Sequence, residues 1–496
     1  MSETQSRLKH RDDAIIAAQD YFAQGLFEKE FAEAIACPTC SPESDPARRQ
    51  FERYFDQVVG PQLDAAGFRR SVHPNPLAGD VAAAGPFLFA ERIENPGLRT
   101  VLIYGHADTV GGMDANWAEG LTPFELNRRD DRLYGRGAAD NKVQHWIAIK
   151  ALRFVLAAKG HLGFNVKLLL ETGEETGSPG LREFCEANGG LLAADVLIAS
   201  DGPRLKPDRP TIFTGARGAI NFELVADYRD GAHHSGNWGG LLKDPGTRLA
   251  HALATITDPR GRIEVPEWRP LNSLTDRVRE LLAACEPLDD PADRLPGEPA
   301  IDRDWGEPNL SPAERVFGWN SFAVLALDLG NPATPANAIA GAARAVCQLR
   351  FVVGTDQNDI LPALRRHFDA LGFKDIEVRA DKDDVAMAAT RVNPDNPWVG
   401  WARDSLALTT GKDPAILPNL GGSLPNDCFA DTLGLTTIWI PHSYRGCNQH
   451  APNEHVLTPV VEEGLRMMTG LFWDLEDGPK EFQAEFQAPF QAEFKA

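Results

Sequence analysis

Apolar residues recur at helical spacing through DAIIAAQDYFAQGLF and FERYFDQVVGPQLDAAGF, which predicts helices between about residues 10 and 70. Between about residues 86 and 214, β-rich apolar runs alternate with helical patterns, as is typical of βαβ units that build a parallel sheet. The clearest of these helices lies in NKVQHWIAIKALRFVLAAKG, where Gly160 is expected to end it. The first half of the chain therefore predicts an α/β fold with a mostly parallel sheet.

The pattern changes after Arg217. GAINFELVADYRD alternates as a strand does, VLALDL and ARAVCQLRFVV predict two more strands, and ILPALRRHFDAL predicts a helix. Together these segments indicate an α+β sandwich inserted into the first domain, with a proline- and acid-rich excursion at about 285–315. We therefore expect one domain split between 1–215 and 392–475, an insert at 216–391, and a low-complexity, Phe-rich tail at 476–496.

The composition is that of a globular protein with a strongly negative net charge. Hydrophobic residues make up 43% and charged residues 24%, so a substantial core is expected. A formal charge of -21 disfavours nucleic acid or an anionic membrane as a partner, because both are bound through lysine and arginine. No run of about 18 apolar residues predicts a membrane span, and the N-terminal residues lack the apolar run of a signal peptide.

Seven cysteines spread over a long chain argue against a disulfide framework and for a reducing compartment, which predicts a cytoplasmic protein. Cys37 and Cys40 form a single CxxC pair. Without a second pair or histidine partners nearby, a loop with two inert thiols is favoured over a metal or redox site. No role is assigned to this pair.

Several strand-like segments run into a residue that can bind a metal ion. Ligands collect at the carboxyl ends of parallel strands, where side chains far apart in sequence converge. Each residue alone has an ordinary structural explanation, such as a helix cap or a solvated acidic loop. The candidates are His106 after LIYG, Glu174 and Glu175 after KLLL, Asp201 after VLIAS, His450 beyond TTIWIPH, and Asp140 before the helix that ends at Gly160.

Taken together, these donors outnumber the four ligands of one tetrahedral zinc ion, so two metal ions that share one carboxylate fit better. Such a pair of ions polarises a water molecule and the substrate oxygen jointly. Of the neighbouring Glu174 and Glu175, one can bind metal while the other takes a proton from water. Histidine and carboxylate ligands suit Zn²⁺, with Mn²⁺ and Co²⁺ as alternatives.

The motifs HADTV, RGAADNK, ETGEETGSPG, ASDG, HHSGNWGG, GGSLP and HAPNE occur in the order found in the M20 family of dinuclear zinc peptidases. The chain resembles this family over about residues 50–472, and its carnosinase-like dipeptidase branch most of all. The resemblance implies a phosphorylase/hydrolase-like catalytic domain with an inserted lid and dimerisation domain. It also implies that His106 and Asp201 bind one ion, Glu175 and His450 the other, and that Asp140 bridges them, with Glu174 as general base and Asp108 orienting His106.

The same resemblance assigns residues of the insert. His234 would reach into the active site of the partner subunit and stabilise the oxyanion, which implies a homodimer formed through the lid. Arg350 and Asn337 would bind the carboxylate and backbone of the substrate, and Gly422 and Ser423 would form a loop that contacts it. The chain departs from the family pattern at Ala232-His233, Ala340 and Val143, none of which is a predicted ligand.

Aspartate at position 201 is associated in this family with aminopeptidases and dipeptidases. The expected reaction is hydrolysis of a peptide or amide bond in a dipeptide or similar small substrate with a free carboxylate, by a metal-bridging water that Glu174 activates. The alternatives are an N-acyl-amino-acid amidohydrolase or carboxypeptidase of the same family, and a non-catalytic metal-binding scaffold, because a fold alone does not guarantee activity.

Overall fold

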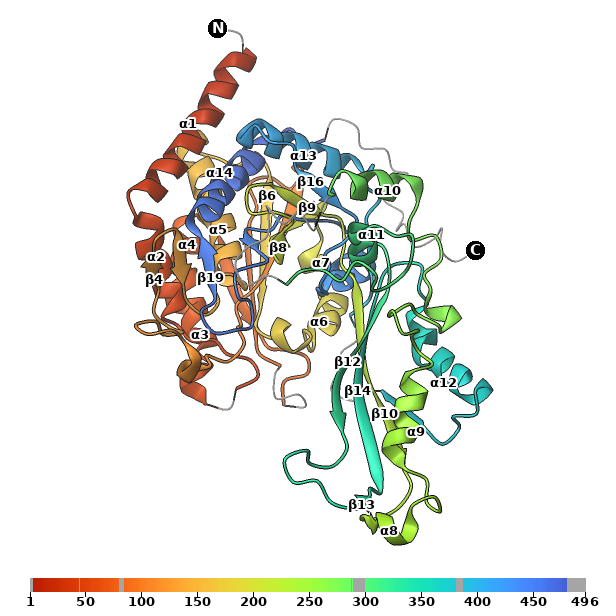
Figure 1. The fold of residues 1–496 in the computed structure, drawn as a ribbon. Helices are drawn as coiled ribbons and strands as arrows, with labels where there is room; N and C mark the ends of the chain where they lie inside the picture. The colour runs from red at the N-terminus through yellow and green to blue at the C-terminus, as the bar shows by residue number, and fades with distance from the viewer. Residues whose placement is uncertain are drawn as a thin grey trace.

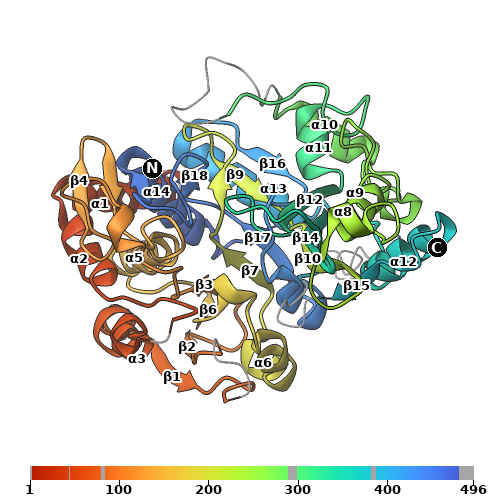
Figure 2. The ribbon, with the colours of Figure 1, turned by 60° about the horizontal axis from the view of Figure 1, so that its bottom comes forward.

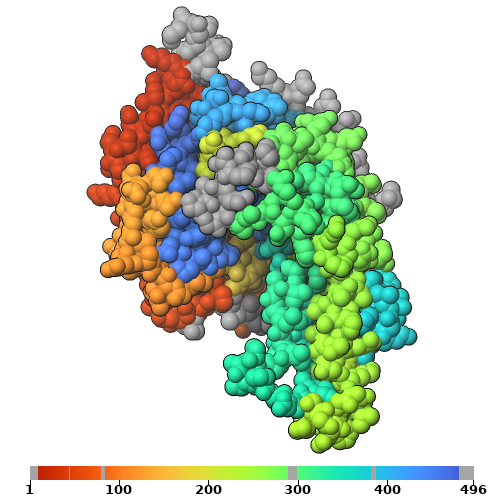
Figure 3. All heavy atoms as spheres, in the orientation of Figure 1, coloured from red at the N-terminus to blue at the C-terminus, as the bar shows by residue number. Residues whose placement is uncertain are grey.

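A computed structural model describes residues 3–43, 45–79, 84–286, 288, 299–380 and 387–479. The molecule has a large lobe built around one sheet and an elongated second lobe that projects from it (Figures 1 and 3). The N-terminal and C-terminal thirds of the chain both contribute to the large lobe, while the middle third forms the projection (Figure 1). The Phe-rich part of the predicted tail, from residue 480 on, lies outside the described residues.

The large lobe contains an eight-stranded sheet with the order β1-β2-β6-β3-β7-β17-β9-β16. The strands β3, β6, β7 and β17 run parallel in its centre, β9 pairs in parallel with β16, and β1 and β2 are antiparallel at one edge. The predicted α/β fold with a mostly parallel sheet is therefore confirmed. The bounds of the strands are β1 Arg69–His73, β2 Phe87–Arg92, β3 Thr100–His106, β6 Asn165–Glu171, β7 Val196–Ala199, β9 Thr211–Phe213, β16 Ala415–Leu417 and β17 Thr436–Trp439.

The central strands are buried on both faces, which explains their nearly continuous apolar sequences. In β3, Val101 and Ile103 face one hydrophobic core while Leu102 and Tyr104 face another, as the two-residue period of a strand requires. The first core is covered by α1 (Glu3–Ala23), α5 (Lys142–Lys159) and α14 (Thr458–Asp474), which lie together on one side of the sheet (Figure 2). Gly160 ends α5 with a positive φ of 78°, as its position in the sequence predicted.

The projecting lobe is an antiparallel sheet with the order β12-β14-β10-β15 and helices on one face. Its strands are β10 (Gly218–Asp227), β12 (Ser321–Asp328), β14 (Ala342–Phe351) and β15 (Glu377–Ala380). The helices α9 (Pro245–Leu253) and α12 (Ile360–Ala370) contribute to a third core, which contains Phe222, Leu249 and Phe368. This is the α+β layer expected of the insert.

Part of the sequence range predicted for the insert packs on the large lobe. The helices α10 (Asp276–Ala283) and α11 (Pro312–Phe317) place Val278, Leu282 and Phe317 in the second core, beside the central sheet. α11 begins with a capping box between Ser311 and Glu314 and with Pro312 in its first turn, so its start is well defined. The proline- and acid-rich excursion thus ends in a short helix that is fixed against the sheet.

All seven cysteines are free and buried. Among the helices of the described residues, none combines the length and the apolar character that crossing a membrane requires.

Candidate active site

The predicted metal-binding residues meet at the carboxyl ends of the parallel strands. His106 is the last residue of β3, β6 leads into the short helix η4 (Glu174–Thr176), and Asp201 lies two residues beyond β7. Because β3, β6 and β7 are parallel neighbours, their carboxyl ends lie side by side. The loops before α5 and after β17 bring Asp140 and His450 to the same place.

His106 lies between two sets of carboxylates and is completely buried. Its Nε2 is 3.0 Å from Asp140 Oδ1 and 3.5 Å from Asp201 Oδ2, while its Nδ1 is 3.3 Å from Asp108 Oδ1. Burial alone would lower the pKa of His106, but Asp108 and then Asp140 and Asp201 outweigh burial and raise that pKa well above its usual value. The fold therefore brings Asp108 to one imidazole nitrogen, and Asp140 and Asp201 to the other.

Asp140 lies between the two histidines. Its Oδ1 faces His106, and its Oδ2 is 3.1 Å from His450 Nε2, which in turn lies 2.8 Å from Glu175 Oε2. Burial would raise the pKa of Asp140, but the hydrogen bonds of His106 and His450 hold it below its usual range. The Asp140 hydrogen bond, followed by the Glu175 carboxylate, raises the pKa of His450 to about 11.

The donor set fits a cation. Glu175 Oε2 and Asp201 Oδ2 are buried oxygens that accept no aligned hydrogen bond within the described part of the chain, even though a histidine nitrogen is near each of them. Buried carboxylate oxygens without a donor are costly, and a metal ion removes that cost. His106, Asp140 and Glu175 each offer one ligand atom, and these three atoms lie within 4.8 Å of one another.

Glu174 lies beside the candidate metal ligands. Its carboxylate Oε2 is 3.9 Å from His106 Nε2, and its backbone N–H, like that of Glu175, donates to the Asp108 carboxylate, at 3.3 Å and 3.1 Å respectively. Burial, with the negative charges of Asp201, Glu175 and Asp140, raises the pKa of Glu174 well above its usual value despite His106 nearby. A carboxylate with a raised pKa is suited to accept and return a proton near neutral pH.

The cluster opens onto a cavity of about 450 Å³. Asp140, Glu174, Asp201 and His450 line one part of it, and three of the predicted substrate-binding residues, Arg350, Gly422 and Ser423, line another. Arg350 Nη1 donates to Ser423 Oγ at 3.0 Å. The cavity thus lies where the two lobes meet. Arg350 comes from β14 of the projecting lobe, and the other residues named here come from the large lobe.

The other two residues of the insert, His234 and Asn337, lie elsewhere. His234 is in β11 (His233–His234) and Asn337 directly precedes β13 (Ala338–Ile339), at the far end of the projecting lobe beside α8 (Ser235–Trp238) (Figure 1). The Asn337 carbonyl oxygen accepts hydrogen bonds from Ser235 N and Oγ, which holds the two segments together. Neither residue is among the described residues that line the cavity of the same chain.

Glu454 was missed by the sequence reasoning although it lies in the HAPNE motif. It is buried, and its carboxylate accepts hydrogen bonds from Arg136 Nη1 at 2.7 Å and from three backbone N–H groups of the loop that carries Asp140. Glu454 therefore ties the loop of Asp140 to the loop of His450. The sequence does not indicate this contact, because Glu454 and Arg136 are far apart in the chain. The one local signal is the short spacing between His450 and Glu454 in the HAPNE motif.

Glu171 is a second buried carboxylate that the sequence analysis did not single out. Tyr104 Oη donates to its Oε1 at 2.5 Å and Ser178 Oγ donates at 3.0 Å. Burial and then the charge of Asp108 raise its pKa to about 7. Because Ser178 follows the Glu174–Glu175 turn, Glu171 anchors that turn to the end of its own strand.

The CxxC loop packs directly behind the His106 loop. Thr39 Oγ1 donates to the Ala107 carbonyl oxygen at 2.6 Å, and Lys142 Nζ donates to the Cys37 carbonyl oxygen at 2.7 Å. Burial raises the pKa of the Cys37 and Cys40 thiols, which makes them less reactive. The loop therefore supports the site through its backbone and Thr39, and the raised thiol pKa is in line with the two unreactive thiols favoured from the sequence.

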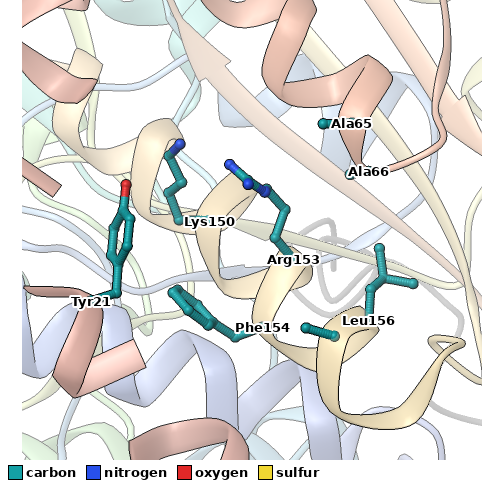
Figure 4. A pocket seen from close by; sticks show the side chains of 8 residues that line it. Tyr21, Ala65, Ala66, Lys150, Arg153, Phe154 and Leu156 are labelled. Carbon is teal, nitrogen blue, oxygen red and sulfur yellow. The ribbon is translucent and has the colours of Figure 1, made fainter. Parts of the chain in front are cut away.

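A second hollow, of about 410 Å³, lies between α1, α5 and α4 (Gly60–Ala65) and is shown in Figure 4. The charged side chains that line it already have partners within the protein. Lys150 pairs with Glu30, and both Lys150 and Arg153 donate to Gln62 Oε1, at 2.6 Å and 2.7 Å. None of the predicted site residues lines it.

Comparisons with known proteins show the family and the fold of this chain. The model of Peptidase family M20/M25/M40 matches residues 102–474. The Beta-Ala-His dipeptidase of Rattus norvegicus is 24% identical over 474 residues, which cover 92% of this chain and 93% of the rat protein. Two solved structures share the fold. Human carnosine dipeptidase 1 has a TM-score of 0.76 at 22% identity over 94% of this chain and 99% of its own. The M20 family metallo-carboxypeptidase Sso-CP2 from Sulfolobus solfataricus has a TM-score of 0.74 at 24% identity over 90% of this chain and 98% of its own.

The protein is therefore a hydrolase of the metallopeptidase class. Within that class the chain belongs to the M20/M25/M40 peptidase family, because the family model spans most of its length. The resemblance found in the sequence motifs is thereby confirmed. Membership implies divalent metal ions, in agreement with the donor set at the ends of β3, β6 and β7.

Replacing Glu454 with glutamine should lower the free energy of unfolding by about 3 to 5 kcal/mol, because it removes one partner of a buried ion pair and leaves Arg136 uncompensated. The metal content of the purified protein should fall as well, since the Asp140 loop loses its anchor. Urea unfolding of the metal-free protein and elemental analysis measure the two effects.

The matched control is Glu462→Gln on α14, a half-buried glutamate for which no ion pair is found among the described residues. Its effect should stay within about 0.5 kcal/mol. Equal effects of the two substitutions would contradict the anchoring role of Glu454.

Proposed function

We propose that this protein is a dinuclear metal-dependent dipeptidase. The observation that carries the proposal is the position of Glu174. Its largely buried carboxylate lines the cavity 3.9 Å from His106 Nε2 and is not among the buried oxygens that lack a hydrogen bond. Metal-assisted hydrolysis needs a group that can transfer a proton beside a cluster of metal-binding side chains, and Glu174 has that position. The relatives named above are dipeptidases or a carboxypeptidase, which supports a small peptide as substrate.

The ligand assignment has His106 and Asp201 on one ion, Glu175 and His450 on the other, and Asp140 shared. The two oxygens of Asp140 support it, because one faces His106 and the other faces His450. Zn²⁺ is the proposed metal on grounds of ligand chemistry, with Mn²⁺ or Co²⁺ as alternatives. When bound, the ions would polarise the scissile carbonyl and make a water molecule more acidic.

The chain's own residues would carry the proton. Glu174 takes a proton from the attacking water and returns it to the leaving amine, which its raised pKa favours. Asp108 holds the His106 ring from behind, and its carboxylate also accepts the backbone N–H groups of Glu174 and Glu175. One side chain would therefore position both a ligand and the general base.

The substrate would present a free carboxylate to Arg350, whose planar guanidinium can donate two parallel hydrogen bonds. Gly422 and Ser423 would contact the same end of the substrate, since Ser423 Oγ lies 3.0 Å from Arg350 Nη1. A second candidate function is that of a carboxypeptidase or N-acyl-amino-acid amidohydrolase with the same metal centre. It is supported by the carboxypeptidase among the similar structures.

The active unit is proposed to be a homodimer formed through the lid, with His234 and Asn337 completing the site of the partner subunit. Two observations support it. His234 and Asn337 lie together at the end of the projecting lobe, away from the cavity of their own chain. β12 is an edge strand of the lid sheet, and it exposes Leu325 and Leu327 by 54% and 65%. An exposed apolar edge strand is a surface that a second copy would cover.

We further propose a cytoplasmic location. The seven free, buried cysteines suit a reducing compartment, because none of them contributes a disulfide bond. The strongly negative charge of the chain suits a protein that binds neither nucleic acid nor an anionic membrane.

Removal of the metal ions with a chelator should abolish peptide hydrolysis, and Zn²⁺, Mn²⁺ or Co²⁺ should restore it to different extents. The metal-free protein should also unfold more easily. Ions present at one hundred times their dissociation constant stabilise the fold by about 2.7 kcal/mol per site. Activity assays and calorimetry with measured metal content check both effects, and hydrolysis that survives full removal of the metal would refute the proposal.

Replacing Glu174 with glutamine should lower kcat by about 10² to 10⁴-fold while metal content stays unchanged, because the amide cannot carry the proton. The matched control is Glu183→Gln on α6 (Leu181–Ala187), an exposed glutamate. A Glu174→Gln variant with near-normal turnover would show that another group is the base, and a non-catalytic scaffold would hydrolyse nothing in either form.

Replacing His234 with alanine should depress kcat and leave metal content unchanged. When His234→Ala and Glu174→Gln chains are mixed, half of the dimers pair the two variants, and each such dimer has one intact site. About a quarter of the wild-type activity should therefore return for a symmetric dimer. Adding Leu325→Asp to both chains should prevent pairing and remove this regained activity. Mixed chains that remain inactive while forming dimers would contradict a site shared between subunits.

A further inference from the structure

The cavity has an apolar wall that neither the metal ligands nor the carboxylate-binding residues explain. Leu205, Phe213, Leu417 and Leu420 line it from the large lobe, and Val316 and Phe317 line it from α11. Leu288, from the excursion before α11, lies in the same wall. The excursion therefore contributes to the site.

Arg350 lines the polar side of the cavity, and Arg217 lies next to the loop 421–423 that lines it. Within the described residues, no ion pair with a carboxylate is found for either arginine. Arg350 donates to Ser423 Oγ, and Arg217 Nε donates to the Gly421 carbonyl oxygen at 2.8 Å. Burial, with the charge of Arg350, lowers the pKa of Arg217 to about 9. Arg350 is half-buried and has the buried Arg217 as a positively charged neighbour, so an anion beside Arg350 in the cavity is favoured.

The loop 421–423 joins the arginines to the apolar wall. A methyl group placed on Gly421 would lie 3.3 Å from Val316 Cγ1 and 3.5 Å from Phe317 Cε1, and one placed on Gly422 would lie 3.6 Å from Leu420 Cδ2. A carboxylate bound at Arg350 and Ser423 is thus about one residue away from this wall. The side chain on the same α-carbon as that carboxylate would meet Val316, Phe317 and Leu420.

The position of α11 is well fixed. Ser273 Oγ donates to the Gly318 carbonyl oxygen at 2.9 Å, and Ala313 N donates to Glu286 Oε1 at 2.6 Å. Arg279 of α10 pairs with Glu314 of the capping box. A wall held at both ends of its helix can select a side chain by shape and polarity, because it does not move aside for a poor fit.

We infer that the substrate residue that carries the free carboxylate has an apolar side chain of about leucine to phenylalanine size. This inference rests on the proposed function, since it assigns the substrate class of that same site. Charged side chains at this position are disfavoured, because burial against leucine and phenylalanine would remove their hydration without a partner. The N-terminal residue of the substrate does not meet this wall and is not selected by it.

The test is a panel of dipeptides with the metal-loaded wild-type protein. Ala-Leu and Ala-Phe should have kcat/KM values at least about tenfold above that of Ala-Gly, because each methylene in a hydrophobic pocket is worth about tenfold or more. Ala-Asp and Ala-Lys should be the poorest substrates. The reversed peptides Leu-Gly and Phe-Gly should gain nothing over Ala-Gly.

Val316 provides the decisive variant, since it is 41% exposed and can be changed without emptying a core. Val316→Asp should lower the Ala-Leu to Ala-Gly ratio of kcat/KM by about tenfold, and Val316→Ile should retain that ratio. Val72→Asp is the matched control, because Val72 is 46% exposed on β1 and does not line the cavity. The control should leave the ratio unchanged.

The outcomes separate the two claims. Equal kcat/KM values across the panel, or a preference that follows the N-terminal residue, would overturn the inference and leave the dipeptidase proposal standing. Equal effects of Val316→Asp and Val72→Asp on the ratio would also overturn it. If the metal-loaded protein hydrolyses no peptide of the panel, the proposed function fails and the inference fails with it.

Discussion

Buried negative charge at the carboxyl ends of the central strands is the constraint on which the rest of this structure depends. The carboxylates that converge there are Asp108, Asp140, Glu171, Glu174, Glu175, Asp201 and Glu454. Buried charges are tolerated only with hydrogen-bond donors or cations beside them. Glu171 and Glu454 have such donors within the protein, whereas Glu175 and Asp201 each keep an oxygen without one. These two oxygens are therefore the places where a bound metal ion would supply a partner that the protein's own hydrogen bonds do not.

The surrounding structure holds these charges in place through contacts between loops that are distant in sequence. Glu454 connects the loop of His450 to the loop of Asp140, and Thr39 holds the backbone behind His106. Lys142, at the start of α5, binds backbone carbonyl groups of the N-terminal segment. A site whose ligands are positioned before metal binds loses less conformational freedom on binding, and this favours tight and selective binding.

The two lobes contribute different residues to the candidate active site. The large lobe supplies every candidate ligand and Glu174, while β14 of the projecting lobe supplies Arg350 at the cavity. α10 and α11 follow the chain into the insert yet pack on the large lobe, where α11 forms one wall of the cavity. One wall of the cavity thus comes from a segment whose proline-rich sequence carries little helical or strand periodicity, so the position of this segment could not be predicted from its sequence.

Local sequence signals were sufficient where the physical cause is local. The two-residue and 3.6-residue periods predicted the central strands and α5, and the ends of those strands marked His106, Glu174, Glu175 and Asp201, because parallel strands end at one edge. The sequence did not indicate three buried charged residues, Arg136, Glu171 and Arg217. The role of a buried charge becomes evident only through its partner, and here each partner is distant in sequence or lies on another strand. Tertiary packing also separated His234 and Asn337 from the cavity of their own chain and placed Val316 beside Gly421. Such contacts depend on how whole elements pack together, which no spacing of residues along one segment can specify.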